Sequence, residues 1–299
     1  MHRSDRIEPA SDPAAGPSLA RLRDRIDHID RQIHDLLMER SEVVEQVADA
    51  KGRPPASESG AVYMRPGREA AILRRLSDRH RGRLPVSVLL RIWREIVGGF
   101  TQMQAPFSVA AVCSGEHRAL WDIARDYYGC TTPVISTDHA NAALRAVMEN
   151  RAAVAVLPIP EDGDPQSWWP TLMAAGGTTP NIIARLPFLD RSDGISAFAI
   201  ARIPPEPTED DRSLIAVEVD HDVSRSRLKG VFETAGWPVT AIWSMQRPGD
   251  AVSLHLIEVA GALHRHDRRL EEIAGRLGEG SARLVSIGGY ATPLTVTDA

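Results

Sequence analysis

The sequence predicts a multidomain protein in which an all-α helical domain precedes an α/β domain and a ferredoxin-like α+β domain. Three observations favour this fold class. Residues 19–51 lack proline and glycine and repeat apolar residues every three or four positions, which is typical of one long amphipathic helix. After residue 106, short β-rich runs alternate with helical ones. The stretch 212–294 shows the order β-α-β-β-α-β of ferredoxin-like domains.

The helical domain is predicted over residues 18–105, behind a disordered tail at 1–17. Pro66 and Pro85 open two further helices that end near residues 80 and 104. The apolar stripe of the first helix consists of Leu22, Ile26, Ile29, Ile33, Leu36, Val43 and Val47. The apolar side of the third helix consists of Leu89, Ile92, Trp93, Ile96, Phe100 and Met103. A first helix about 50 Å long cannot bury its stripe against two short ones, so we expect an intertwined homodimer.

The second domain is predicted over residues 106–205, and a linker rich in proline and acidic residues separates it from the third domain at 212–294. In the second domain, strands are expected at 108–113, 152–159 and 195–202, and helices at 116–128 and 140–150. In the third, strands are expected at 213–219, 238–245, 251–259 and 282–287, and helices at 224–235 and 265–277.

Charge and composition exclude several classes of protein. Residues 1–104 carry 18 basic and 15 acidic side chains, and the rest carries 17 and 25, so we expect no nucleic-acid binding but a small anionic ligand in the first part. Without an apolar run of eighteen residues or a secretory signal, we expect no membrane insertion and a cytoplasmic location. Cys113 and Cys130 form no Cys-x-x-Cys pair and the histidines form no His-Glu-x-x-His motif, so no metal site is expected.

Two cations of the first helix stand out. Arg40 occupies a position that the apolar repeat assigns to an apolar residue, and a buried guanidinium must be paired. Lys51 lies eleven residues further, about 20° around the helix, so both side chains point the same way. Lys51 is also one of only two lysines, with Lys229, among 35 basic residues. The alternative interpretation of Arg40 is an ordinary buried salt bridge with a neighbouring acid.

Short motifs across the three helices resemble those of the all-helical chorismate mutases. The matching segments are Leu22-Arg23-x-x-Ile26, Ile29-Asp30, Leu36-Leu37, Glu39-Arg40, Ala50-Lys51, Arg65-Pro66-x-Arg68-Glu69-x-x-Ile72-Leu73 and Ile92-x-Arg94-Glu95-Ile96. The order of the three domains also resembles the bifunctional chorismate mutase/prephenate dehydratases. That resemblance implies an α/β periplasmic-binding-like, dehydratase-like middle domain and a phenylalanine-sensing ACT domain at the end.

The resemblance implies an enzyme of phenylalanine and tyrosine biosynthesis that rearranges chorismate to prephenate within one molecule. In that family the reaction uses no cofactor, no metal and no covalent intermediate. The substrate is held in a compact conformation, and donors face the ether oxygen that gains negative charge. The resemblance assigns Lys51 and Gln104 to this ether oxygen, and Glu69 to the ring hydroxyl of the substrate.

The same resemblance assigns arginines to the two substrate carboxylates, which suit bidentate guanidinium groups. These are Arg40 and Arg68 of one chain and Arg23 of its partner in the homodimer. Arg65 is a further candidate for substrate binding, although it stands where some relatives carry an aspartate, and the alternative is a solvated loop arginine. Phe100 departs from the family as well, because many relatives carry a serine there.

The second and third domains keep the family's frame but lose its functional motifs. Ala153–Ile159 and Ile287–Tyr290 resemble the corresponding strands, whereas Pro160-Glu161-Asp162 replaces Glu-Asn-Ser and Ser196-Ala197-Phe198 replaces Thr-Arg-Phe. We therefore expect a degenerate dehydratase-like domain without dehydratase activity. Residues 243–248 half match the effector motif Glu-Ser-Arg-Pro, and the Gly-Ala-Leu turn is replaced around 223–225. An aromatic amino-acid effector therefore remains an open possibility.

The leading hypothesis from the sequence is a homodimeric chorismate mutase that carries two degenerate domains. Two alternatives stay open. The first is a bifunctional chorismate mutase/prephenate dehydratase that uses other residues for dehydration. The second is a non-catalytic sensor of aromatic amino acids.

Overall fold

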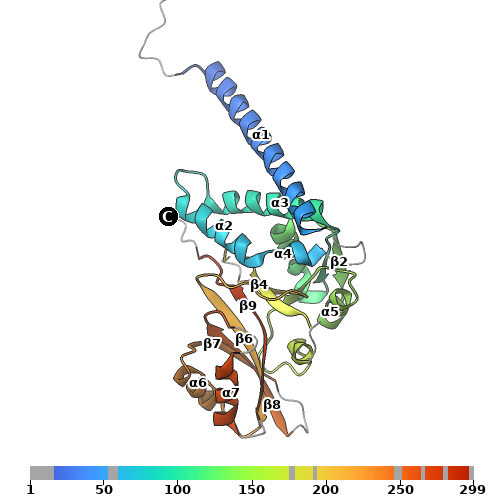
Figure 1. The fold of residues 1–299 in the computed structure, drawn as a ribbon, viewed down its shortest axis with the longest axis vertical. Coiled ribbons are helices and arrows are strands. Elements are labelled where there is room, and N and C mark those ends of the chain that lie inside the picture. Colours follow the sequence, from blue (N-terminus) through green and yellow to red (C-terminus); the bar gives the residue numbers. More distant parts are fainter. Residues whose placement is uncertain are drawn as a thin grey trace, which may run out of the picture. The chain divides into compact units, whose positions relative to one another are not determined.

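The computed structural model describes residues 17–52, 60–174, 179–190, 194–245, 251–263, 267–278 and 282–295 of the 299-residue chain. Apart from residue 17, the predicted disordered tail lies outside these described residues. The chain divides into two compact units, residues 1–52 and residues 53–299. Figure 1 shows the elements of both. No helix in the described ranges is long and apolar enough to cross a membrane.

The first unit contains the long helix α1, Leu19–Lys51, with the bounds that the sequence predicts. Ser18 caps its first turn by accepting a hydrogen bond from the Arg21 N–H at 3.4 Å, and Gly52 ends it with a φ of +73°. The side chains of the predicted apolar stripe are between 42% and 63% exposed. The described residues therefore leave the stripe of α1 largely uncovered.

The second unit contains six helices and nine strands in its described residues. The helices are α2 (Pro66–Arg79), α3 (Val86–Gln104), α4 (Ala119–Tyr128), α5 (Ala140–Met148), α6 (Arg225–Thr234) and α7 (Arg268–Leu277), and 3₁₀ turns lie at Gly60–Tyr63, Gly115–Arg118 and Trp169–Met173. The strands are β1 (Val109–Val112), β2 (Val134–Thr137), β3 (Val154–Pro158), β4 (Asn181–Leu186), β5 (Ala197–Ala201), β6 (Asp211–Asp220), β7 (Val239–Met245), β8 (Val252–Ala260) and β9 (Arg283–Ala291). Every predicted element is present with shifted bounds, whereas β2 and β4 were not predicted.

The described strands form one sheet in the order β2-β1-β3-β5-β4-β9-β6-β8-β7. Strands β2, β1 and β3 are parallel, and β5 is antiparallel to both β3 and β4. The part β9-β6-β8-β7 is antiparallel throughout and confirms the predicted β-α-β-β-α-β arrangement. The two predicted β-containing domains thus share a single sheet.

The junction of the two halves is a parallel contact between Ile182 of β4 and Gly288 of β9. Gly288 has a φ of +137°, and a Cβ placed on it would lie 2.2 Å from the Ile182 carbonyl oxygen. Only glycine tolerates both the conformation and the close approach. Gly288 therefore allows the two halves of the sheet to join at β4 and β9.

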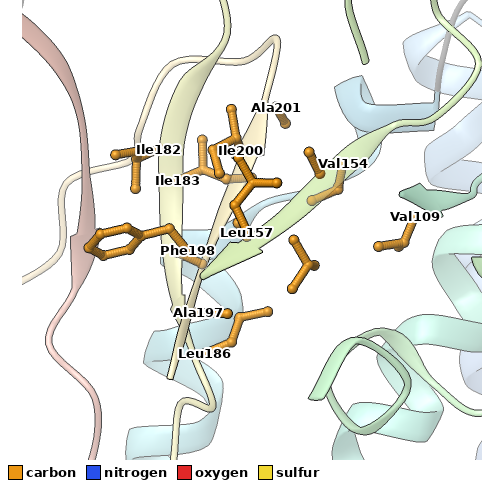
Figure 2. Close-up of a cluster of buried hydrophobic side chains, with 14 of the residues drawn as sticks. Val109, Val154, Leu157, Ile182, Ile183, Leu186, Ala197, Phe198, Ile200 and Ala201 are labelled. Carbon is orange, nitrogen blue, oxygen red and sulfur yellow. The ribbon is translucent and has the colours of Figure 1, made fainter. Parts of the chain in front are cut away.

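Two hydrophobic clusters stabilise this sheet. The larger one centres on β3, β4 and β5, where Leu157, Ile182 and Phe198 are fully buried (Figure 2). The second lies between α6, α7 and the β6–β8 strands, and it includes Phe232 and Ile273. Burial of such side chains contributes roughly 1.5–3 kcal/mol each, so both clusters stabilise the packing of the helices of the second unit on the sheet.

Helix α3 buries one face against the rest of the second unit. Its buried residues are Val86, Leu90, Arg94, Gly98 and Thr101. A Cβ on Gly98 would lie 2.1 Å from the Tyr128 carbonyl oxygen, so the glycine lets α3 approach α4 closely. The predicted side is partly open, with Ile92 47% exposed. Trp93 of this side packs against the core, so the apolar side is covered in part, and Gly98 makes the close approach of α3 to α4 possible.

Candidate active site

The predicted site residues fall into both units of the chain. Arg23, Arg40 and Lys51 lie on α1, whereas the other four lie on or beside α2 and α3. Because α1 is one uninterrupted helix, Arg40 and Lys51 are about 20° apart around its axis, as the sequence predicts. Arg23 is about 100° from Arg40 on the same axis. These three cations therefore define two directions on one helix.

The start of α2 carries Arg65 and Arg68 and binds a carboxylate of the protein itself. The guanidinium of Arg65 forms an ion pair with Glu206, a residue of the linker that precedes β6. The second oxygen of Glu206 accepts hydrogen bonds from the backbone N–H groups of Gly67 at 3.2 Å and Arg68 at 3.4 Å. The Arg68 side chain is exposed and makes no ion pair within the described residues. The N-terminus of α2 is thus occupied by an anion.

Glu69 is held by a buried arginine that the sequence analysis did not assign to the site. Nη1 of Arg94 donates to Oε2 of Glu69 at 2.8 Å, and the two side chains are 6% and 14% exposed. The Arg94 guanidinium also lies over the ring of Tyr127, 3.6 Å from its centroid. Burial, the largest cause, raises the pKa of Tyr127 above its ordinary value. Tyr127 of α4 thus supports Arg94, and Arg94 orients Glu69.

Gln104 ends α3 with its side chain turned back on the helix. Its Nε2 donates to the Phe100 carbonyl oxygen at 3.0 Å. The following residue, Ala105, is buried with an extended backbone, so the chain leaves the helix directly after Gln104. The amide is half-buried and can exchange this local hydrogen bond for another acceptor by rotating its side chain.

Sequence reasoning missed two residues that act on the predicted ones. Arg94 was part of a matched motif, and its four-residue spacing from Leu90 and Gly98 marks it as a member of the buried face of α3. Glu206 carries no comparable signal, because it lies 141 residues from Arg65 in a proline-rich linker. Only the folded chain brings it to α2.

A second polar cluster joins three segments of the second unit, around Asp162, Arg225 and Ser244. The Asp162 carboxylate accepts hydrogen bonds from Arg225 Nη1 at 2.6 Å and from the Ser244 N–H at 2.7 Å. These interactions lower the pKa of Asp162 against the opposing effect of desolvation. The Ser244 hydroxyl lies 2.9 Å from Nδ1 of His255, which is 5% exposed. These residues therefore form a structural link between the two halves of the sheet.

We expect the stability of the protein to fall below neutral pH because of His255. Desolvation first, and then the positive charge of Arg225, lower the pKa of His255 below its ordinary value of 6.5, while Asp162 opposes the shift. Between pH 6.5 and this lowered pKa, His255 is protonated in the unfolded state but neutral in the folded state. The free energy of unfolding therefore decreases as the pH falls through this range. The slope contributed by one such proton is at most about 1.4 kcal/mol per pH unit.

Urea unfolding of the wild type and of His255→Asn at pH 7.5 and 5.5 checks this. Asparagine keeps a polar group beside Ser244 and does not titrate. The difference in unfolding free energy between the two pH values should be smaller in the variant. An equal difference in both proteins would contradict a role for His255.

Comparisons with known proteins find relatives of the segment that contains α1, α2 and α3. A family profile described as chorismate mutase type II matches residues 22–105. The bifunctional chorismate mutase/prephenate dehydratase of Neisseria gonorrhoeae is 38% identical over 88 residues, which cover 29% of this chain and 22% of that protein. This chain thus matches about a fifth of the length of that curated relative.

Solved structures resemble part of the chain at low identity. A structure titled "GqqA- a novel type of quorum quenching acylases" covers 62% of this chain and 94% of its own, with 18% identity and a TM-score of 0.47. The prephenate dehydratase of Streptococcus mutans covers 64% of this chain and all of its own, with 11% identity and a TM-score of 0.44.

The matched residues span α1, α2 and α3 and include all seven predicted site residues. The sheet that follows lies outside this match. Residues 22–105 therefore form a chorismate mutase type II domain, followed in the same chain by an α/β sheet domain.

Proposed function

We propose that this protein is a chorismate mutase that converts chorismate to prephenate. The observation that carries the proposal is the family match over residues 22–105 together with Arg40 and Lys51 on one side of α1. Purified protein should consume chorismate in an absorbance assay and form prephenate without added metal or cofactor. Absence of turnover would leave the amino-acid sensor as the alternative.

The proposed reaction needs positioning and charge stabilisation only. Chorismate carries two carboxylates, and guanidinium groups bind such groups bidentately, which would hold the reacting carbons together. Arg40, Arg68 and the Arg23 of a second chain are assigned to the carboxylates. Lys51 and Gln104 are assigned to the ether oxygen, where negative charge grows in the transition state. Glu69, oriented by Arg94, would accept a hydrogen bond from the ring hydroxyl.

The proposed assembly is a homodimer in which α1 of each chain covers the other. Among the described residues, the apolar stripe of α1 and the side chains of Ile92 and Met103 on α3 are exposed, and such faces mark protein interfaces. Arg23 points about 100° away from Arg40, so one chain does not present all three cations in one direction. A second copy supplies both an apolar partner and the missing arginine.

Mixing two inactive variants tests this arrangement. Arg23→Ala and Lys51→Ala should each lose activity as homodimers, because each site then lacks one cation. After unfolding and joint refolding, half of the dimers combine the two chains, and each of these contains one intact site. About a quarter of the wild-type activity should therefore return if Arg23 acts across a twofold interface. No recovery would show that Arg23 serves its own chain.

We further propose that dehydratase activity is absent. Pro160-Glu161-Asp162 and Ser196-Ala197-Phe198 stand where the dehydratases that this chain resembles carry Glu-Asn-Ser and Thr-Arg-Phe. Asp162 is moreover engaged by Arg225 and Ser244. Prephenate should therefore give no phenylpyruvate. Phenylpyruvate formation would support the bifunctional alternative.

A change in chorismate turnover or in thermal stability on adding phenylalanine would identify the ferredoxin-like half as an ACT-type effector domain.

A further inference from the structure

Residues 204–208, here called the strap, lie in the linker between β5 and β6. They contact the first turn of α2. The strap places the Glu206 carboxylate on Arg65 and on the N–H groups of Gly67 and Arg68. We propose that Glu206 is an internal competitor that occupies the carboxylate-binding position of the mutase site and lowers its affinity for substrate. This inference rests on the proposed function, since it gives Arg65 and the start of α2 a role in binding chorismate.

The chemistry of this position is that of an anion site. The N-cap residue of α2, Arg65, makes no side-chain capping hydrogen bond, so the first N–H groups of the helix need an acceptor from elsewhere. The helix dipole and the guanidinium both favour a negative charge there. A substrate carboxylate offers the same two oxygens and the same charge as the Glu206 side chain, so only one of them can occupy the position.

The strap is seated by shape as well as by charge. A Cβ on Gly67 would lie 2.8 Å from the Glu206 Cβ and 3.0 Å from the Glu206 carbonyl oxygen. Arg74, two turns along α2, donates to Thr208 Oγ1 at 2.9 Å and to the Asp210 carbonyl oxygen at 2.7 Å. The strap therefore connects the helix that carries Arg65 with the start of strand β6.

The contact is weak enough to be reversible. The Arg65 side chain is 53% exposed and that of Glu206 is 24% exposed, so water and salt screen their attraction. A strap that covers the position part of the time reduces apparent affinity in proportion to the open fraction and leaves the chemical step unchanged. Removing it should therefore change KM and not kcat.

Steady-state kinetics on two different variants test the inference. Glu206→Gln keeps an oxygen that can accept from the Gly67 N–H but removes the charge, and Gly67→Ala pushes the strap away sterically. Both should lower the KM for chorismate, by about threefold for Glu206→Gln, with kcat unchanged. The control is Glu209→Gln, an exposed acid of the same linker, which should keep the wild-type KM.

A raised or unchanged KM in Glu206→Gln would contradict the proposal that Glu206 competes with substrate. A raised KM would mean that the Glu206 carboxylate helps Arg65 to bind substrate. Labelling with phenylglyoxal and peptide mass mapping reads the contact without turnover. Arg65 should be labelled faster in Glu206→Gln than in the wild type and in Glu209→Gln. Unchanged labelling would overturn the contact itself. Faster labelling in a protein that does not rearrange chorismate would overturn the proposed function, and the competition with it.

Discussion

Lys51→Ala should lower kcat/KM for chorismate by at least about two powers of ten. Removing a donor that faces a developing oxyanion costs about 3 kcal/mol of transition-state stabilisation or more, and the loss should appear mainly in kcat. Lys51 is one of two lysines in a chain that otherwise uses arginine, which fits a single-oxygen role for a compact ammonium group. Lys51→Arg should therefore recover only part of the activity.

The chain offers its own control for this substitution. Lys229, the other lysine, lies on α6 with Nζ 3.8 Å from Glu233, and its side chain is 55% exposed. Lys229→Ala should leave kcat and KM at the wild-type values. Far-ultraviolet circular dichroism should show intact helices in both variants. Wild-type turnover by Lys51→Ala would remove Lys51 from the site and would weaken the assignment of α1 as a whole.

The sequence predicted the secondary structure best where the local pattern of apolar residues determines the element. Residues 19–51 form α1 with the predicted bounds, because Ser18 and Gly52 stop the helix and nothing within it competes. The β-α-β-β-α-β order was also readable, since each element has a clear pattern. Strand β2 escaped prediction because four half-exposed residues give too short a pattern. Strand β4 lies between Pro180 and Pro187, which made the segment resemble a loop.

Contacts between residues far apart in the sequence determine the features that could not be predicted from it. The sequence shows the apolar side of α3 but not the face that packs on α4, where Gly98 allows a close approach. The single sheet depends on one glycine contact between β4 and β9. Glu206 and Arg65 meet across 141 residues. No local pattern encodes such pairs, and the residues that support a site are therefore harder to predict than the residues that form it.

Arg94→Met should destabilise the second unit by about 3–5 kcal/mol, the usual cost of removing one partner of a buried ion pair. Methionine fills much of the volume over Tyr127 but leaves the Glu69 carboxylate, 14% exposed, without its guanidinium. Activity should fall as well, because Glu69 loses the group that orients it. Urea unfolding followed by tryptophan fluorescence measures the change in unfolding free energy, and turnover is measured on the fraction that stays folded.

Arg91→Met is the matched control, since Arg91 lies one turn earlier on α3 and pairs with Asp126 at 2.5 Å at the surface, where its side chain is 66% exposed. A surface pair of this kind contributes about 0.2–1 kcal/mol, so the control should stay near the wild type. The double variant Arg94→Met/Glu69→Gln should recover part of the lost stability, because it removes the unpaired charge. Equal destabilisation in the single and double variants would show that packing on Tyr127, and not the ion pair with Glu69, is what Arg94 contributes.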